Sequence, residues 1–202
     1  MALAPQFAGH TLGSANAAHT IEAYLDFVCP FSAKFFTKFY DEVLPYLEKE
    51  HHGKVKFVFR QQVQPWHPNS TLVHEAAIAV ERIDPSKFIP FARALFQRQR
   101  EYFDEATYFQ SRHEIYGRLA DLAASVGVSG ETFLGLVSVP TGEPRNIGNK
   151  ITADLKLQIR LGRQNGIHVS PTVLWDGIRD DSVSSSWEIY QWKEWLRNKI
   201  TA

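Results

Sequence analysis

The amino-acid sequence predicts an α/β protein in which an all-helical insertion separates a βαβ half from a ββα half. Apolar residues alternate with polar ones near the N-terminus, take helical spacing through the middle of the chain, and form short runs again near the C-terminus. Helix start and stop signals mark the boundaries of these regions. The expected order is strand, helix, strand, several helices, strand, strand, helix.

The βαβ half begins with an alternating apolar run at residues 19–28, which predicts a strand. A helix follows with Pro30 at its first position, where the missing amide hydrogen costs nothing. Pro45 lies inside the same helical pattern and removes a backbone hydrogen bond, so we expect a kink or the helix end there. Residues 54–63 alternate again and predict a second strand, parallel to the first.

Residues 70–166 have helical spacing and form the expected insertion. Asp84 precedes a proline in the manner of a helix start, and Ser111 with Glu114 forms a capping-box pattern. Apolar residues recur at steps of four over residues 145–164, which predicts a long final helix in this region.

The ββα half returns to short strands. An Asp176–Gly177 turn signal between a short apolar run and a polar run predicts a hairpin, and residues 186–200 predict a closing helix. The hairpin is expected to extend the sheet of the βαβ half. We therefore expect a single chain unit, 1–202, with two parts: the sheet domain, 19–69 with 167–202, and the helical insertion, 70–166.

Composition and charge argue against several classes of function. The chain has 202 residues, 44% of them hydrophobic, and 22 basic against 22 acidic residues. This balance disfavours nucleic-acid binding, which needs a surplus of positive charge. We find no secretory signal and no run of about 18 apolar residues, so we expect a cytoplasmic protein without a membrane partner. A lone cysteine forms no internal disulfide, which agrees with a reducing compartment.

The only cysteine, Cys29, lies where the first strand meets the helix that begins at Pro30. At a helix N-terminus, the macrodipole and the unpaired amides favour a thiolate over a thiol. The alternative is that Cys29 is a small buried hydrophobic residue. Ser32 is close to one helical turn away, so its hydroxyl could donate to the Cys29 sulfur or bond the local backbone.

Two motifs and the element order resemble the thioredoxin fold. The first motif is DFVCPFS, Asp26 to Ser32, and the second is GIHVSPT, Gly166 to Thr172. A helical insertion between the two halves is similar to the branch of DsbA-like oxidoreductases and kappa-class glutathione transferases. The resemblance covers residues from about 19 to 200 and implies a thioredoxin-like fold.

The first motif lies between the patterns of the two families. DsbA-like oxidoreductases have two cysteines here, whereas this chain has Ser32 at the second position. Kappa-class transferases usually have serine-proline-aromatic-serine, so Cys29 matches their glutathione-activating serine. The resemblance implies catalytic roles for Cys29 and Ser32, and contacts to glutathione from Pro30 and Phe31.

The second motif resembles the cis-proline loop of the fold. In the family, the residue before that proline presents its backbone to bound glutathione or peptide. The resemblance carries this role onto Ser170 and Pro171, with Val169 beside them.

Further candidates come from loops. The loop QPWHPNS, residues 64–70, could lie over Cys29, as the corresponding loop does in similar transferases. This makes Trp66, His67 and Asn69 candidate glutathione contacts, with a rigid connection as the alternative. His168 could touch a ligand carboxylate, and residues 180–182 could receive the γ-glutamyl amine, although packed or solvated positions are the alternative. The histidines show no metal-ligand spacing, so we predict no metal site.

The resemblance and the lone cysteine together favour a glutathione-linked thiol–disulfide oxidoreductase or thioltransferase. In this hypothesis Cys29 attacks a glutathione mixed disulfide, takes the glutathionyl group, and is released by a second glutathione, since no resolving cysteine exists. The alternatives are a kappa-class-like glutathione transferase or isomerase, and a redox-inactive binding module of the same fold. The expected partners are glutathione as co-substrate and a small-molecule or protein thiol; a homodimer stays open, because kappa-class relatives are commonly dimers.

Overall fold

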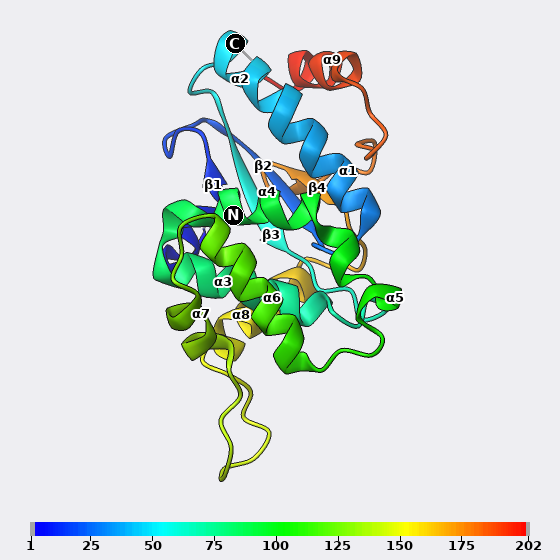
Figure 1. The fold of residues 1–202 in the computed structure, drawn as a ribbon. Helices are drawn as coiled ribbons and strands as arrows, with labels where there is room; N and C mark the ends of the chain where they lie inside the picture. Colours follow the sequence, from blue (N-terminus) through cyan, green and yellow to red (C-terminus); the bar gives the residue numbers. More distant parts are fainter. Residues whose placement is uncertain (1–2, 201–202) are drawn as a thin grey trace.

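A mixed β-sheet lies at the centre of the protein (Figure 1), in a computed structural model that describes residues 3–200. Residues 1, 2, 201 and 202, which the expected ranges 1–202 and 167–202 include, lie outside the described part. The strand order is β1-β3-β2-β4-β5. The strands are β1 (Thr11–Leu12), β2 (His19–Leu25), β3 (Val55–Gln61), β4 (Thr172–Trp175) and β5 (Ile178–Arg179).

The expected βαβ unit is present. Strands β2 and β3 are parallel, with Ile21 opposite Phe57, and the crossover between them is helical. The crossover contains α1 (Pro30–Lys38), the π-helical segment η2 (Phe39–Val43) and α2 (Leu44–Glu50). The π-helical segment lies directly before Pro45, so the helix accommodates the missing hydrogen bond by a local change of winding.

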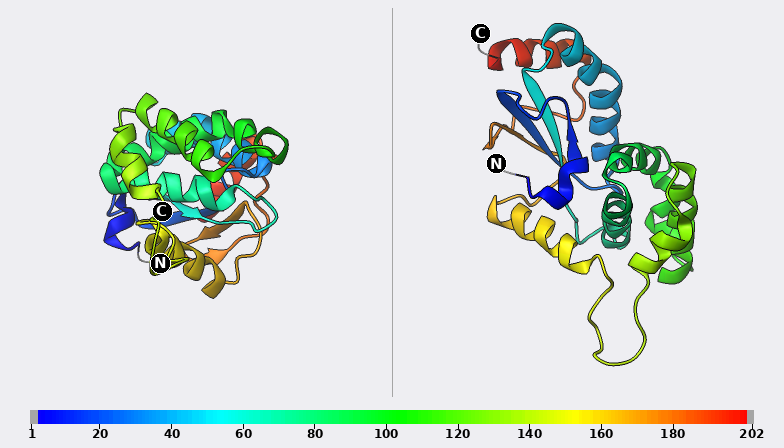
Figure 2. Two further views of the ribbon diagram at one scale, coloured as in Figure 1. Left: turned by 60° about the horizontal axis from the view of Figure 1, so that its bottom comes forward. Right: turned by 90° about the vertical axis from the view of Figure 1, so that its left-hand side faces the viewer.

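The two faces of the sheet are covered by different helices. On one face, the ring centre of Phe39 in η2 lies 4.4 Å from the ring centre of Phe57. Trp192 of α9 (Ile189–Lys199) packs edge-on against Phe39. On the other face, Tyr24 forms a small buried cluster with Ile167 and Leu174. The helix α8 (Thr152–Gln164) lies on this second side, opposite α1 and α2, as the right-hand view of Figure 2 shows.

The C-terminal hairpin extends the sheet as expected. Strand β4 runs antiparallel to β2, and β5 runs antiparallel to β4. Asp176 and Gly177 both have positive φ angles, 49° and 83°, which a two-residue hairpin turn of this kind requires. The Asp176 carboxylate also accepts a hydrogen bond from the Thr20 backbone N–H at 2.7 Å, which ties the turn to β2.

Between β3 and α8, the helices are α3 (Ser70–Ile83), η3 (Pro85–Lys87), α4 (Phe88–Gln97), η4 (Gln99–Tyr102), α5 (Asp104–Thr107), α6 (Arg112–Ser125) and α7 (Gly130–Val137). Two of the helices between β3 and β4, η3 and α6, begin at the predicted caps. The Asp84 side chain accepts a hydrogen bond from the Ser86 backbone N–H at 2.9 Å, and Ser111 forms a capping box with Glu114. Phe88 and Phe96 of α4 pack against Phe59 of β3, on the face of the sheet that α1 also covers.

The helix predicted over residues 145–164 begins later, at Thr152, and that prediction is wrong at its start. Residues 138–149 form a loop that projects from the body of the protein (Figures 1 and 2). Gly148 has a φ angle of 81°, which interrupts the helix, and Asn149 Oδ1 accepts the Ile151 N–H at 2.9 Å in the turn that leads into α8. The helical spacing of the apolar residues therefore continued beyond the helix itself.

The N-terminal segment carries structure that the sequence analysis did not assign. The 3₁₀ helix η1 (Pro5–His10) leads into β1, which pairs antiparallel with β3 at the sheet edge. Gly9 donates its backbone N–H to Glu81 at 2.8 Å and packs so tightly that a Cβ atom would lie 2.2 Å from the Pro85 carbonyl oxygen. Within residues 3–200 no helix has the length and apolar character needed to cross a membrane.

Candidate functional site

Cys29 lies at the junction of β2 and α1, as predicted. Its backbone is extended, with φ −83° and ψ 120°, and it serves as the N-cap residue of α1 with Pro30 at the first helical position. Its carbonyl oxygen accepts the first helical hydrogen bond, from the Ala33 N–H at 3.1 Å. The Cys29 residue is 3% exposed, so only a small part of its surface is accessible to a reagent.

The second motif meets the first at the sulfur. The peptide bond between Ser170 and Pro171 is cis, and the Cys29 thiol donates to the Ser170 carbonyl oxygen at 3.5 Å. The Ser170 backbone N–H in turn donates to Gln64 Oε1 at 2.9 Å. The structure thus joins residues 141 positions apart in the sequence, and the buried Gln64 holds the loop in place beside the thiol.

The carboxylate of Asp26 is the centre of a buried hydrogen-bond network behind Cys29. The Asp26 side chain is fully buried, and two backbone N–H groups, one hydroxyl and one histidine contact its two oxygens. A second histidine lies 3.7 Å away. These partners are Val28 N at 3.0 Å, Gln64 N at 3.1 Å, Ser70 Oγ at 3.0 Å, His67 Nδ1 at 3.1 Å and His74 Nε2.

The groups around Asp26 keep its carboxyl ionised. Burial raises the pKa of Asp26, but His74, the Val28 N–H and His67 lower it by more, so the carboxyl pKa lies below its usual value. The negative charge therefore stays in the interior at neutral pH, held by its donors. The network fixes the turn between β2 and α1, which positions the thiol.

The predicted site residues separate into those that join this network and those that remain at the surface. The Ser32 hydroxyl is buried and accepts a hydrogen bond from the Asp26 backbone N–H at 3.2 Å, the local backbone bond that was one of its two expected roles. His67 reaches the network, whereas its neighbour Trp66 is 56% exposed. Phe31 of the first motif and Val169 of the second motif are exposed as well.

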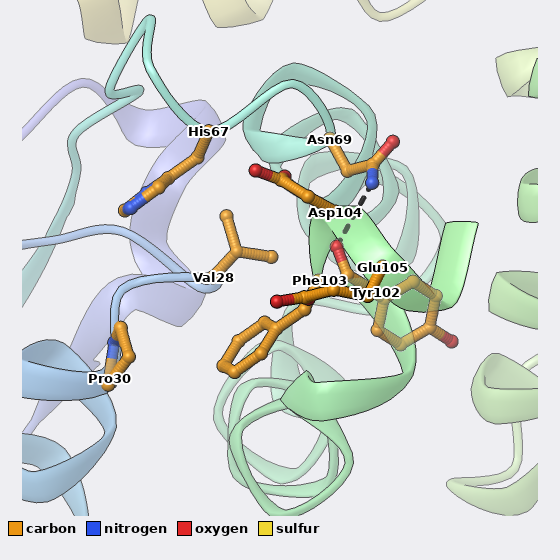
Figure 3. A pocket seen from close by; sticks show the side chains of 8 residues that line it. All are labelled: Val28, Pro30, His67, Asn69, Tyr102, Phe103, Asp104 and Glu105. Atoms are coloured by element: carbon orange, nitrogen blue, oxygen red, sulfur yellow. Dashed lines mark hydrogen bonds between the residues drawn. The ribbon is translucent and has the colours of Figure 1, made fainter. Parts of the chain in front are cut away.

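A cavity of about 170 Å³ opens beside the reactive residue. Val28 and Pro30, the two neighbours of Cys29 in the sequence, form one wall, and His67 lies at its edge (Figure 3). The opposite wall comes from the segment that leads from η4 into α5, with Phe103 at its centre. The cavity therefore lies between the βαβ half and the helices that follow β3.

Sequence reasoning missed three buried residues that build the site. Asp26 was quoted only as the first residue of the motif, and Gln64 was not named as a contact. Gln99 donates from Nε2 to the Phe27 carbonyl oxygen at 2.9 Å and to the Cys29 carbonyl oxygen at 3.4 Å. A charged residue inside an apolar run of sequence, as at Asp26, is the one available signal, because buried charges need partners.

The lesser candidates lie in other surroundings. His168 is exposed and contacts the carbonyl oxygen of Gly166. The Asp180 carboxylate is engaged by Ser182, by Trp195 Nε1 at 3.1 Å and by Lys199 at 2.9 Å, a structural role at the end of β5. No group of three or more potential metal-ligating side chains occurs in the described part of the chain.

Comparison with known proteins gives the family. A thioredoxin family model matches residues 6–196. The chain belongs to the thioredoxin family. A search of curated protein sequences gives no match.

Solved structures agree with this assignment at the level of the fold. A candidate protein-disulfide isomerase from Pseudomonas syringae is 23% identical, with a TM-score of 0.74 over 95% of this chain and 99% of that one. BdbD from Bacillus subtilis is 23% identical (TM-score 0.64; 94% and 91% covered), and the thiol-disulfide exchange protein alpha-DsbA2 from Wolbachia pipientis is 17% identical (0.64; 93% and 85%). The predicted thioredoxin-like fold with a helical insertion is therefore confirmed.

Proposed function

We propose that the protein is a thiol–disulfide oxidoreductase that uses Cys29 as its single nucleophile and glutathione as co-substrate. The observation that carries the proposal is the contact between the Cys29 sulfur and the Ser170 carbonyl oxygen of the cis-proline loop, at the N-terminus of α1. At the N-terminus of a helix, the macrodipole favours negative charge on a group in that position. Membership of the thioredoxin family supports the same chemistry.

The proposed reaction is a pair of thiol–disulfide exchanges. The Cys29 sulfur, after losing its proton to solvent, attacks one sulfur of a disulfide; a new S–S bond forms to Cys29, and the other sulfur leaves with the bonding electrons. A glutathione thiolate then attacks the substrate sulfur that is bonded to Cys29, and the Cys29 sulfur leaves as a thiolate. The net result is exchange of one thiol for glutathione in the disulfide, without another oxidant or reductant.

The second position of the motif explains why glutathione is needed. Ser32 is buried and bonded to the Asp26 backbone, and no second cysteine exists in the chain to resolve the mixed disulfide internally. A small external thiol is therefore the simplest resolving agent. We propose the cytoplasm as the place of action, because glutathione is kept reduced there.

Intact mass spectrometry after incubation with oxidised glutathione tests the proposal. We expect one glutathionyl adduct, which reduced glutathione removes and which Cys29→Ser does not form. Ser138→Ala, at an exposed serine after α7, is the matched control and keeps the adduct. Absence of an adduct in the parent protein contradicts the proposal.

A redox-inactive binding module is a second candidate, favoured by the low exposure of Cys29. In that case Cys29→Ala retains partner binding, and no glutathionyl adduct forms with the parent protein. A kappa-class-like transferase is distinguished by a conjugation assay with glutathione and 1-chloro-2,4-dinitrobenzene. Conjugation that survives Cys29→Ser supports that class, since serine is the usual residue there in the family.

A further inference from the structure

The two segments that meet at the Cys29 sulfur are both held by Asp26. Its Oδ1 accepts the Val28 backbone N–H at 3.0 Å, next to Cys29 in the first motif. Its Oδ2 accepts the Gln64 backbone N–H at 3.1 Å, and the Gln64 side chain continues to the second motif, where its Oε1 accepts the Ser170 N–H at 2.9 Å. One carboxylate thus fixes one segment directly and the other through Gln64.

The position of Ser170 depends on the Gln64 amide. Within residues 3–200 the Ser170 hydroxyl is buried and makes no hydrogen bond. The Ser170 carbonyl oxygen accepts the Cys29 thiol at 3.5 Å, and the Ser170 N–H donates to Gln64. Gln64 is 3% exposed, so water does not compete for this hydrogen bond. The Gln64 amide is therefore the polar group that holds the Ser170 carbonyl oxygen beside the sulfur.

The contact at the sulfur favours one protonation state. A carbonyl oxygen has no proton to donate, so it accepts a hydrogen bond from a thiol but offers none to a thiolate. Hydrogen bonding to the neutral form of an acid disfavours its ionised form. This effect opposes the macrodipole of α1, which favours negative charge at the same place. Because disulfide exchange requires the thiolate, the position of the Ser170 carbonyl oxygen affects the rate of exchange.

We propose that Gln64 is a positioning residue that holds the Ser170 carbonyl oxygen against the Cys29 thiol and thereby limits the fraction of Cys29 in the thiolate form. This inference rests on the proposed thiol–disulfide exchange and names a residue that sets its rate. Within residues 3–200 Gln64 makes no hydrogen bond to the sulfur, so it acts through Ser170. Without the Gln64 acceptor the buried Ser170 N–H lacks a partner, and we expect the loop to shift and its carbonyl oxygen to leave the sulfur.

Alkylation of Cys29 by iodoacetamide tests the inference, because the thiolate is the reacting form and the chain has a single cysteine. The rate is measured by intact mass from pH 6 to pH 10 for the parent and for Gln64→Met, which keeps an unbranched side chain but removes the acceptor. We expect Gln64→Met to react roughly fivefold faster at pH 6–7, the effect of one hydrogen bond on an equilibrium. Towards pH 10 ionisation nears completion in both proteins, and the two rates are expected to converge.

The pH profile separates this role from a structural one. A loop that is only loosened exposes the sulfur more and raises the rate by the same factor at every pH. The other titratable groups on the elements around Cys29 are the same in parent and variants, so their effects cancel in the ratio of the rates. They are Asp26 after β2, His67 in the loop after β3, His74 on α3, Asp104 and Glu105 on α5, and His168 in the cis-proline loop.

Gln62→Met is the matched control. Gln62 donates from Nε2 to the Ile167 carbonyl oxygen at 3.4 Å, so it contacts the same loop three residues before Ser170. We expect the rate profile of Gln62→Met to follow that of the parent. Gln64→Glu keeps an acceptor for the Ser170 N–H and is expected to retain the slow reaction at pH 6–7. If Gln64→Met does not fold, Gln64→Asn replaces it, because its shorter side chain does not reach Ser170.

Several outcomes overturn the inference. They are a Gln64→Met rate equal to that of the parent throughout, a rate ratio that is the same at pH 6 and pH 10, the same pH-dependent ratio in Gln62→Met, and fast reaction of Gln64→Glu at pH 6–7. The proposed function is tested separately with oxidised glutathione. Absence of a glutathionyl adduct in the parent overturns that function, whereas the role of Gln64 is decided by the alkylation rates alone.

Discussion

Two buried carboxylates, each beside a histidine, have pKa values shifted in opposite directions in this protein. Asp26 lies under the candidate site next to His67 and His74, and Glu81 lies in α3 next to His10. Their exposed fractions are 0% and 1%. The pKa of Asp26 is lowered, whereas the pKa of Glu81 is raised to about 8.

The difference comes from the donors that each carboxylate receives. For both acids burial acts first and raises the pKa. Asp26 then gains His74, His67, a hydroxyl and two backbone N–H groups, which outweigh burial. Glu81 receives backbone N–H groups from Gly9 and His10, and Asp154 opposes ionisation further. The two sites teach that the number of donors, and not depth, decides which buried acid keeps its charge.

The histidine beside Glu81 completes that contrast. His10 is fully buried among aromatic rings, with its ring centre 3.8 Å from that of Phe88, and its Nε2 lies 3.2 Å from Glu81 Oε2. Burial lowers the pKa of His10 well below its usual value, helped by the positive charge of Arg60. At neutral pH the pair is therefore uncharged, with one proton on Glu81. It joins the N-terminal segment to the insertion by a neutral contact.

Replacing each carboxylate by its amide is expected to give the largest difference in stability between the two sites. In Asp26→Asn, the amide nitrogen faces donors, so at least one buried donor loses its acceptor. We expect the free energy of unfolding to fall by about 3 kcal/mol or more. In Glu81→Gln at pH 7 the change replaces a protonated acid by a group of the same shape, and we expect a loss of about 1 kcal/mol or less.

Urea unfolding at pH 7 measures both values, and the two variants serve as controls for each other. Equal losses at the two positions contradict the assignment of opposite charge states. Mass spectrometry of Asp26→Asn with oxidised glutathione adds a functional reading. We expect slower adduct formation at Cys29 while the variant is still folded, because the turn that positions the thiol loses its anchor.

The pH dependence of stability is the next test. Above pH 6.5, the usual pKa of His10, its imidazole is neutral in the unfolded protein, and burial keeps it neutral in the folded protein as well. Between 6.5 and about 8 the folded pair holds a proton that the unfolded pair has lost. Stability is therefore lost as pH rises through this window, at up to about 1.36 kcal/mol per pH unit and roughly 2 kcal/mol in total.

Unfolding free energies of the parent and of Glu81→Gln at several pH values between 6 and 9 check this prediction. The decline is expected in the parent and is expected to be absent in Glu81→Gln, which has no proton to lose. An identical decline in both proteins assigns the effect to other groups. Hydrogen exchange of residues 5–12 follows the same titration, because Gly9 and His10 depend on Glu81 for their contact.

Much of the fold could be predicted because local signals and tertiary structure agree. The cysteine-proline junction, the Ser111 capping box and the Asp176–Gly177 turn each satisfy backbone groups within a few residues. The start of α8 was predicted too early, since the apolar period runs past the helix to the half-exposed Ile147. Strand β1 was missed because two residues carry no period and exist only by pairing with β3.

The residues of the site could be predicted only where they belong to one of the two sequence motifs. Cys29 and Ser170 were found through the two motifs, and the structure brings them together. Gln64 and Gln99 were not found, since their roles depend on backbone groups that lie 106 and 72 positions away. The cavity beside Cys29 has the same origin: Phe103 lies opposite Val28 and Pro30 only because the fold brings the segment between η4 and α5 to this place.

The smallest expected change in stability comes from removing His67, one of the groups that donate to Asp26. His67 is a partly exposed donor, with a side-chain exposed fraction of 22%, and without it three buried donors and the nearby His74 remain. We expect His67→Ala to lower the free energy of unfolding by about 1 kcal/mol, because one hydrogen bond to a charged group is lost and water replaces part of it. His168→Ala, at an exposed histidine near the cis-proline loop, is the control and is expected to change stability by less than about 0.5 kcal/mol. A loss at His67 as large as that of Asp26→Asn means that this single histidine, and not the sum of the donors, holds the carboxylate ionised.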